Sequence, residues 1–265
     1  MAEKEKSAPI PESEFNLTED SALALLSKAD VASETCERIA KNGNLLKSRK
    51  VKRALVCHPR TPRHVSVPVA RQLYTFDLMK VALSPTVISD IKVAVDEILI
   101  SRLRTVTEGE RLTLARRATG RVAAALLMDS EIASGKVELR SNDATLGYEK
   151  RDAKGKSNIA TKDTRVMQTA LENPRLTEAL VIKAILTPHA GFGLINAVAH
   201  HTKWSVRRDV RAALLRTEYL SLAKALEYSR EISTHALAEL LGSSRLPEPI
   251  KKQLMKESKD SDSPG

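Results

Sequence analysis

One stretch of this chain repeats its apolar positions far along the sequence. Displaced by 159 positions, the segment from Val51 to Glu97 falls on the segment from Val210 to Lys256 without a gap. The surface residues as a whole do not repeat. Apolar residues fall on apolar residues at Ala54 and Ala213, Leu55 and Leu214, Val67 and Leu226, Leu73 and Ile232, Leu78 and Leu237, Val81 and Leu240, Val87 and Leu246, Ile91 and Ile250, and Val95 and Leu254. A chain that reuses apolar helical faces in this way is expected to stack its helices, each burying its apolar stripe against the next.

A shorter signature around an Ala-Leu pair occurs three times, in residues 53–62, 169–178 and 212–221. In the last two copies, Ala170 and Ala213 lie 43 residues apart. This interval is within the roughly 40 to 47 residues that HEAT and armadillo units span. The spacing therefore favours that class of helical repeat.

An Asp followed closely by Val and Arg stands at the start of two of these helices, in residues 163–166 and 209–211. With these motifs the chain resembles the HEAT-like helical repeat proteins of bacteria, from about Ala22 to Met255 with one interruption. The resemblance implies an all-α fold, a HEAT-like α-solenoid in which antiparallel helix pairs form a right-handed superhelix. It implies a fold and no particular activity.

Composition divides the chain into five parts. Residues 1–20 are rich in Glu, Pro and Ser and are expected to form a disordered acidic arm. Helical repeats are expected in residues 21–130 and, continuing the same array, in residues 164–257. Between them, residues 131–163 lack an apolar period and are expected to form a polar inserted loop, either on a binding face or as a tolerated insertion without a role. Residues 258–265 are expected to be a disordered tail.

The sequence also marks where one helix begins. Residues 107–110 read Thr-Glu-Gly-Glu, which matches a capping box in which Thr107 accepts from the backbone and Glu110 reaches back. A helix from Glu108 to Ala118 is therefore expected. Aromatic residues make up only 3% of the chain, which argues against an all-β fold.

Several classes of protein are not expected. No stretch approaches the roughly 18 apolar residues of a membrane span, and the first residues are too acidic for a secretory signal, so a cytoplasmic protein without a membrane partner is expected. Cys36 and Cys57 have no CxxC partner, and the spacing of His189, His200 and His201 matches no ligand pattern, so no metal site is expected.

Motifs of catalysis are missing from the sequence as well. It contains no GxSxG, Walker, HExxH or GxGxxG pattern. We therefore expect no enzyme, no catalytic residues and no small-molecule cofactor. The HEAT-like DNA glycosylases are one enzyme class with a similar fold. They need an Asp beside aromatic side chains that hold the base. Only Trp204, with Asp209, Phe192 and Tyr219 near it in sequence, offers such residues, and Trp204 is better explained as a packing residue between repeats.

Positive charge is the main functional signal. The net charge is +10, and the excess gathers in three groups, around residues 47–71, 102–121 and 203–216. Because the groups recur at similar points of successive units, stacking is expected to align them along one edge. The residues expected to contact a partner are Arg49, Lys50, Arg53, Arg116, Arg117, Arg207, Arg208 and Arg211.

Two kinds of partner fit such a surface. A protein partner or an acidic segment, bound by a non-catalytic scaffold, is the first expectation, and the acidic arm of the chain itself is one such segment. Nucleic acid, held through its phosphate backbone, is the alternative.

Overall fold

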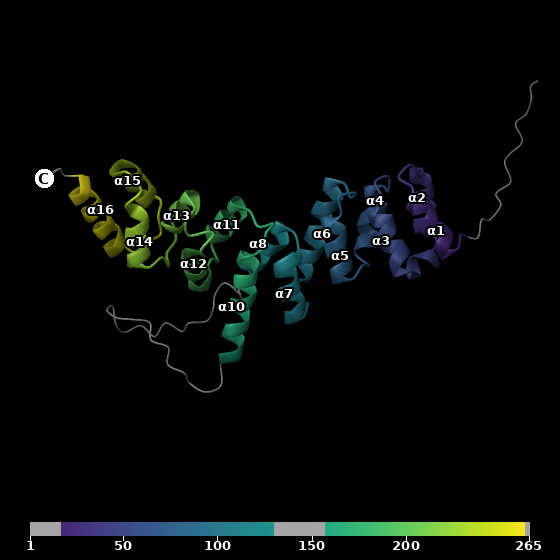
Figure 1. Ribbon diagram of the computed structural model, residues 1–265, viewed down its shortest axis with the longest axis horizontal. Helices are drawn as coiled ribbons and strands as arrows, with labels where there is room; N and C mark the ends of the chain where they lie inside the picture. The colour runs from purple at the N-terminus through teal and green to yellow at the C-terminus, as the bar shows by residue number, and fades with distance from the viewer. Residues whose placement is uncertain (1–16, 130–156, 263–265) are drawn as a thin grey trace, which may run out of the picture. The chain divides into compact units, whose positions relative to one another are not determined.

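The computed structural model describes residues 17–129 and 157–262, and the described part of the chain is helical without strands (Figure 1). The expected all-α class is therefore confirmed. The chain divides into two compact units, Met1–Val95 and Asp96–Gly265, at a boundary within one helix. Each unit is described by itself.

Alternate helices pack against each other in the first unit. Its elements are α1 (Glu19–Leu26), α2 (Ser33–Lys41), the 3-10 turn η1 (Leu45–Lys47), α3 (Arg49–Cys57), α4 (Arg63–Ala70) and α5 (Thr75–Leu83), and α6 (Ser89–Arg102) crosses the boundary. Helix α3 contacts both α1 and α5, α2 contacts α4, and α3 also contacts its chain neighbour α4.

The second unit follows the same scheme. Its helices are α7 (Glu108–Arg117), α8 (Gly120–Met128), α10 (Ser157–Leu171), α11 (Glu178–Ile185), α12 (Phe192–Ala199), α13 (Arg208–Leu214), α14 (Leu222–Ser229), α15 (Thr234–Gly242) and α16 (Glu248–Asp262). Helix α10 contacts α7 and α12, whereas α11 contacts α8 and α13, and α14 contacts α16. Most of these contacts therefore join a helix to the next described helix but one.

The displacement found in the apolar residues also holds for the helices. Helices α4 and α14, and likewise α5 and α15, begin and end 159 positions apart, and α6 and α16 begin 159 positions apart. Leu78 on α5 and Leu237 on α15 are both fully buried. The same positions therefore face the interior in both copies.

Side chains bond to backbone carbonyls of the next helix but one at a nearly constant interval. The interval is 29 or 30 residues in five such bonds, from His58 to Lys28, from Arg60 to Asp30, from Thr86 to Cys57, from Tyr228 to Ala199 and from Ser244 to Leu215. The 43 residues between Ala170 and Ala213 instead lead from α10 to α13, three helices on. A pair of helices in this chain therefore spans about 30 residues.

The ends of the helical segments differ from the expected ones. Glu19 and Asp20, expected in the disordered arm, form the first turn of α1, where negative charge stabilises a helix N-terminus. Helix α10 begins at Ser157, so residues 157–163 of the expected loop are helical. Helix α16 runs to Asp262 and takes in most of the expected tail. No apolar period marks the first turns of α10 or the last turns of α16. Residues 1–16, 130–156 and 263–265 lie outside the described residues.

The capping box is confirmed. The Thr107 side chain accepts from the backbone of Glu110, and the Glu110 carboxylate accepts from the backbone of Thr107. Helix α7 begins at Glu108 as expected.

A glycine allows the loop between α10 and α11 to approach the start of α8 closely. Gly120, the first residue of α8, is buried, and a Cβ added there would lie 2.2 Å from the carbonyl oxygen of Arg175. Replacing Gly120 by Ala is expected to lower the unfolding free energy by about 1–3 kcal/mol, because the backbone must shift. Gly109→Ala on α7 is the control, since nothing lies within 4 Å of its added Cβ. Urea unfolding of both variants checks this, and equal stabilities would contradict it.

Candidate basic edge

Three loops of the second unit are tied together by buried hydrogen bonds. The side chain of Asn173, after α10, donates through Nδ2 to the carbonyl oxygens of Ala115 at 2.7 Å and Ala118 at 3.2 Å, at the end of α7. It also accepts from the backbone N–H of Arg175 at 2.8 Å. The guanidinium of Arg175 donates to the carbonyl oxygen of Arg117 at 3.3 Å. The α10–α11 loop is thereby fixed against the α7–α8 loop.

Trp204 ties the next loop in the same way. Its indole is 2% exposed and donates through Nε1 to the carbonyl oxygen of Leu171, at the end of α10, at 2.9 Å. The Lys203 ammonium lies 4.2 Å from the centre of the indole ring. The expectation that Trp204 is a packing residue is confirmed, and the α12–α13 loop lies beside the α10–α11 loop.

The first unit uses the same device at His58. The ring nitrogen Nε2 lies 2.9 Å from the carbonyl oxygen of Lys28, so it carries the hydrogen, and Nδ1 accepts from the backbone of Arg60 at 3.3 Å. The Arg60 guanidinium donates to the carbonyl oxygen of Asp30. The sequences His-Pro-Arg at 58–60 and Asn-Pro-Arg at 173–175 therefore make equivalent contacts.

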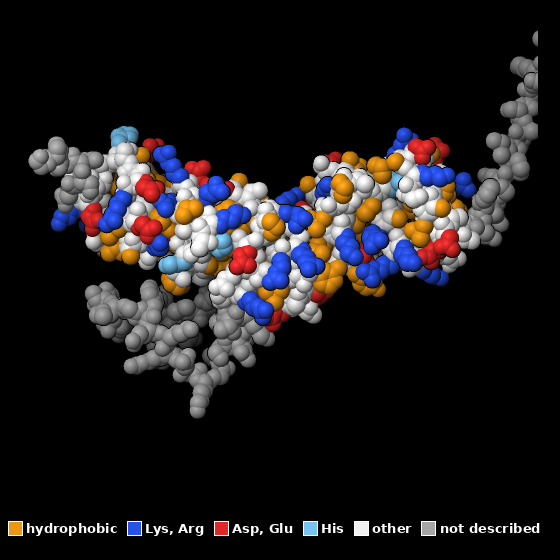
Figure 2. All heavy atoms as spheres, in the orientation of Figure 1, with side chains coloured by type: hydrophobic (Ala, Val, Ile, Leu, Met, Phe, Trp, Pro, Cys, Tyr) orange, Lys and Arg blue, Asp and Glu red, His pale blue; other side chains and the backbone are white. Residues whose placement is uncertain are grey.

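The tied loops of the second unit present a row of exposed cations. We call this row the basic edge; it consists of Arg116, Arg117, Arg175, Lys203, Arg207 and Arg208, all exposed. Within residues 17–129 and 157–262, no ion pair involves Arg116, Arg117, Arg207 or Arg208. Figure 2 shows Lys and Arg side chains gathered over α7 on the face drawn, with hydrophobic side chains between them. Asp209, beside Arg208, is the nearest acid in sequence.

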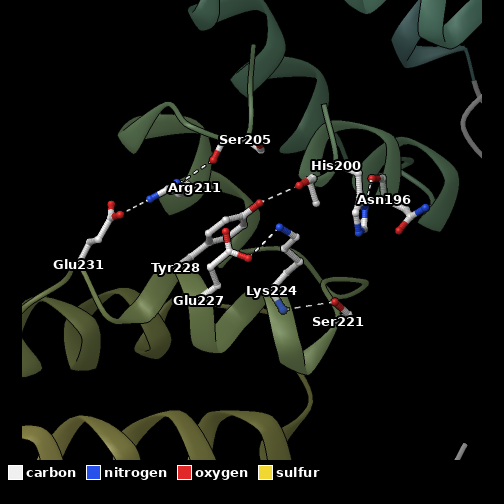
Figure 3. Close-up of polar contacts among 10 residues, drawn as sticks. Asn196, His200, Ser205, Arg211, Ser221, Lys224, Glu227, Tyr228 and Glu231 are labelled. Carbon is white, nitrogen blue, oxygen red and sulfur yellow. Dashed lines mark hydrogen bonds and ion pairs between the residues drawn. The ribbon is translucent and has the colours of Figure 1, made fainter. Parts of the chain in front are cut away.

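The guanidinium of Arg211, which was expected to contact a partner, instead contacts other residues of this chain (Figure 3). Its Nε donates to the carbonyl oxygen of Ser205 at 2.7 Å, and its Nη1 pairs with Glu231. Its guanidinium lies 5.1 Å from the ring centre of Tyr228, whose hydroxyl donates to the carbonyl oxygen of Ala199. Burial raises the pKa of that hydroxyl. Arg211 therefore stabilises the packing of the helices around it and is not part of the basic edge.

Arg49 has a similar structural role in the first unit. Its guanidinium donates through two nitrogens to the fully buried carboxylate of Asp77, which joins α3 to α5. The hydrogen bonds and charge of Asp77 raise the pKa of Arg49. The Arg49 guanidinium also lies 5.4 Å from the ring centre of Tyr74. Lys50 and Arg53, the other expected site residues of this unit, are exposed on α3.

The histidines and cysteines are held by structural contacts. The ring of His200 bonds to the carbonyl oxygen of Asn196, and Nδ1 of His201 accepts from the backbone of Lys203. Burial lowers the pKa of His201, which suits a neutral acceptor. Cys36 is buried and Cys57 half-buried, both as free thiols. Among the described residues no cluster of three metal-ligating side chains occurs.

Two further observations concern DNA glycosylases and membrane proteins. The indole of Trp204 is covered, whereas Asp209 is exposed, so these residues do not together form walls for a flipped base. In the part of the chain that the structure describes, no helix combines the length and the apolar character that crossing a bilayer requires.

Sequence reasoning missed the buried polar residues that join the loops and helices within each unit. Asn173, His58 and Asp77 are buried polar residues whose partners lie 28 to 58 residues away. The recurrence of Pro-Arg after a polar residue at 58–60 and 173–175 was the available signal.

Asn173→Ala is expected to lower the unfolding free energy by about 1–3 kcal/mol, because it leaves the Ala115 and Ala118 carbonyls and the Arg175 N–H without their buried partner. Asn196→Ala, at an exposed position of α12, is the matched control. Urea denaturation measures both. A cost at Asn173 no larger than that at Asn196 would show that the bonds do not stabilise the unit.

Asp96, on α6, provides a dependence of stability on pH. It is 4% exposed and accepts from the Thr119 hydroxyl at 2.8 Å, and burial raises the pKa of its carboxyl group. At pH values between the ordinary pKa of an Asp, about 4, and the raised pKa of Asp96, the folded chain still holds a proton that the unfolded chain has lost. The free energy of unfolding therefore falls as pH rises through this window. Asp96→Asn, which can still accept from Thr119, removes this fall.

The measurement is urea unfolding at several pH values from acid to neutral. The stability of Asp96→Asn relative to the unchanged protein is expected to grow as pH rises through that window. Glu97→Gln, at the neighbouring exposed carboxylate, is the control and should show a smaller trend. A flat difference for Asp96→Asn would contradict the assignment.

The chain matches no family model, no curated protein and no solved structure in the comparisons made.

Proposed function

We propose that this chain is a non-catalytic scaffold, folded as a HEAT-like α-solenoid, whose basic edge binds an acidic segment of a partner protein. Contacts between alternate helices in each unit and the bonds at intervals of 29 and 30 residues support the repeat architecture. Stacked repeats commonly carry an extended binding surface, because each unit places its loops beside those of the next.

The main observation behind this proposal is that exposed Arg and Lys side chains lie on loops that buried hydrogen bonds hold together. Asn173 and Trp204 hold three successive loops side by side, and each loop bears exposed Arg or Lys. A surface fixed in this way loses little conformational freedom on binding, and its guanidinium groups can form charge-assisted hydrogen bonds with carboxylates.

An apolar side chain within the edge favours a protein partner. Val206 is 62% exposed and directly precedes Arg207 and Arg208. Protein interfaces combine apolar contacts with Arg, whereas a phosphate backbone offers little for a valine to contact.

Nucleic acid is the second candidate, and the predominance of Arg in the edge favours it. Five of the six edge residues are Arg, whose planar fork matches phosphate as well as carboxylate. Contacts to phosphates release counterions, so this candidate requires affinity for duplex DNA that falls steeply with salt.

Charge reversal of the edge tests both candidates. Arg207→Glu with Arg208→Glu is compared with Lys80→Glu and Lys183→Glu, an exposed pair outside the edge that changes the net charge equally. The probes are labelled polyglutamate and a labelled DNA duplex, followed by fluorescence anisotropy at several salt concentrations. We expect the edge variant to bind polyglutamate roughly ten-fold more weakly and the control to bind within about two-fold of the original.

The outcomes separate the candidates. Loss of duplex binding in the edge variant, with polyglutamate unaffected, would assign the edge to nucleic acid. Equal binding by the edge and control variants for both probes would show that the edge is not a binding site.

A further inference from the structure

A basic groove with an apolar floor lies between α15 and α16. These are the last two described helices of the chain, and they lie side by side (Figure 1). Its volume is about 530 Å³, and its floor contains Ala238 and Leu241 from α15 and Met255 from α16. Lys252, Lys256 and Lys259 of α16 line its side. The groove is separate from the basic edge.

Helix α16 packs by its opposite side. Leu254 is fully buried, and α16 contacts α14 and α15. Lys252 and Lys256 are exposed, and Met255 is half-buried. Glu248, also in the groove lining, bonds to Lys251 at 3.1 Å and so neutralises part of the charge without removing its excess.

The displacement of 159 positions identifies the side of α6 that is equivalent to the groove side of α16, and that side of α6 contacts another helix. Displacement by 159 positions places Met255, Lys256 and Lys259 on Asp96, Glu97 and Ile100. In the second unit these three residues face α8. Asp96 accepts from Thr119 at 2.8 Å, the cap residue of α8, and Glu97 pairs with Arg121 of α8 at 3.7 Å.

Ile100 completes this face of α6. It lines a cavity together with Ala125 and Met128 of α8. The side of α6 that corresponds to Met255, Lys256 and Lys259 of α16 is therefore the side on which a further helix lies, whereas Val93, the equivalent of Lys252, is exposed.

The charges on this side are opposite in the two copies. On α6, two acidic residues meet a hydroxyl and a guanidinium of α8, whereas on α16 the equivalent residues are apolar or basic. A helix lying on α16 in the same way must therefore carry carboxylates and an apolar stripe. The apolar floor offers nothing to a phosphate backbone, which favours a protein ligand.

We propose that the groove between α15 and α16 binds an acidic amphipathic helix of a partner protein, placed on α16 as α8 is placed on α6. Lys252 and Lys259 are seven residues apart, about 10 Å along the helix, so two turns of the bound helix suffice for the contact. This site does not depend on the function proposed for the basic edge.

The test uses the full chain and a labelled helical peptide of about 15 residues, with Leu and Ala on one face and Glu on the other. A second peptide has Lys in place of every Glu. The groove variant is Lys252→Glu with Lys256→Glu, and Lys80→Glu with Lys183→Glu is the control of equal net charge. Both pairs are exposed, and circular dichroism verifies that all variants are folded.

We expect the groove variant to bind the acidic peptide at least about ten-fold more weakly and to gain affinity for the Lys peptide, since its charges are exchanged. The control should keep the original preference. The edge variant Arg207→Glu with Arg208→Glu should bind polyglutamate more weakly but still bind the amphipathic acidic peptide, whose apolar face fits the groove, so failure at one site is distinguishable from failure at the other.

Three results would overturn the proposal. The first is that the groove and control variants bind the acidic peptide with equal affinity. The second is that the groove variant gains no affinity for the Lys peptide. The third is a self-associated chain, seen by analytical ultracentrifugation, that dissociates when Lys252 and Lys256 are changed. That result would assign the groove to a second copy of this chain.

Discussion

The structure depends on side chains that satisfy the carbonyl groups at helix ends. The last carbonyls of every helix lack a partner within the helix, and burying them unpaired would be costly. His58, Asn173, Trp204 and Tyr228 each supply a donor to such a carbonyl from the next helix but one. Because these donors are buried, they also determine which loops lie together, and the exposed charges of those loops follow from that placement.

The sequence predicts the helices well because burial is periodic in it. Leu78 and Leu237 repeat at the expected distance, are equally buried and belong to helices with matching ends. The limits of the helical segments were predicted less well. Glu19 is stabilised in its helix by charge, and Ser157 begins α10 in a stretch without an apolar period, so neither is marked by apolar spacing.

The candidate site was predictable only in part, since exposure of a charge depends on partners distant in sequence. Arg116, Arg117, Arg207 and Arg208 are exposed as expected. Arg49 and Arg211 look the same in the sequence, but Asp77 and Glu231 lie 28 and 20 residues away from them and engage their guanidinium groups. No local pattern distinguishes a bridging arginine from one that faces solvent.

The bonds of Asn173 have a consequence for the part of the chain between Asp129 and Ser157. They join the C-terminal end of α10 to α7, and α10 also contacts α8, so the helices on either side of that interval are held together by groups outside it. Closing a chain between fixed ends costs only about 0.6 kcal/mol more for each doubling of its length. Foreign sequences of very different lengths can therefore be grafted at this point while the surrounding helices keep their packing.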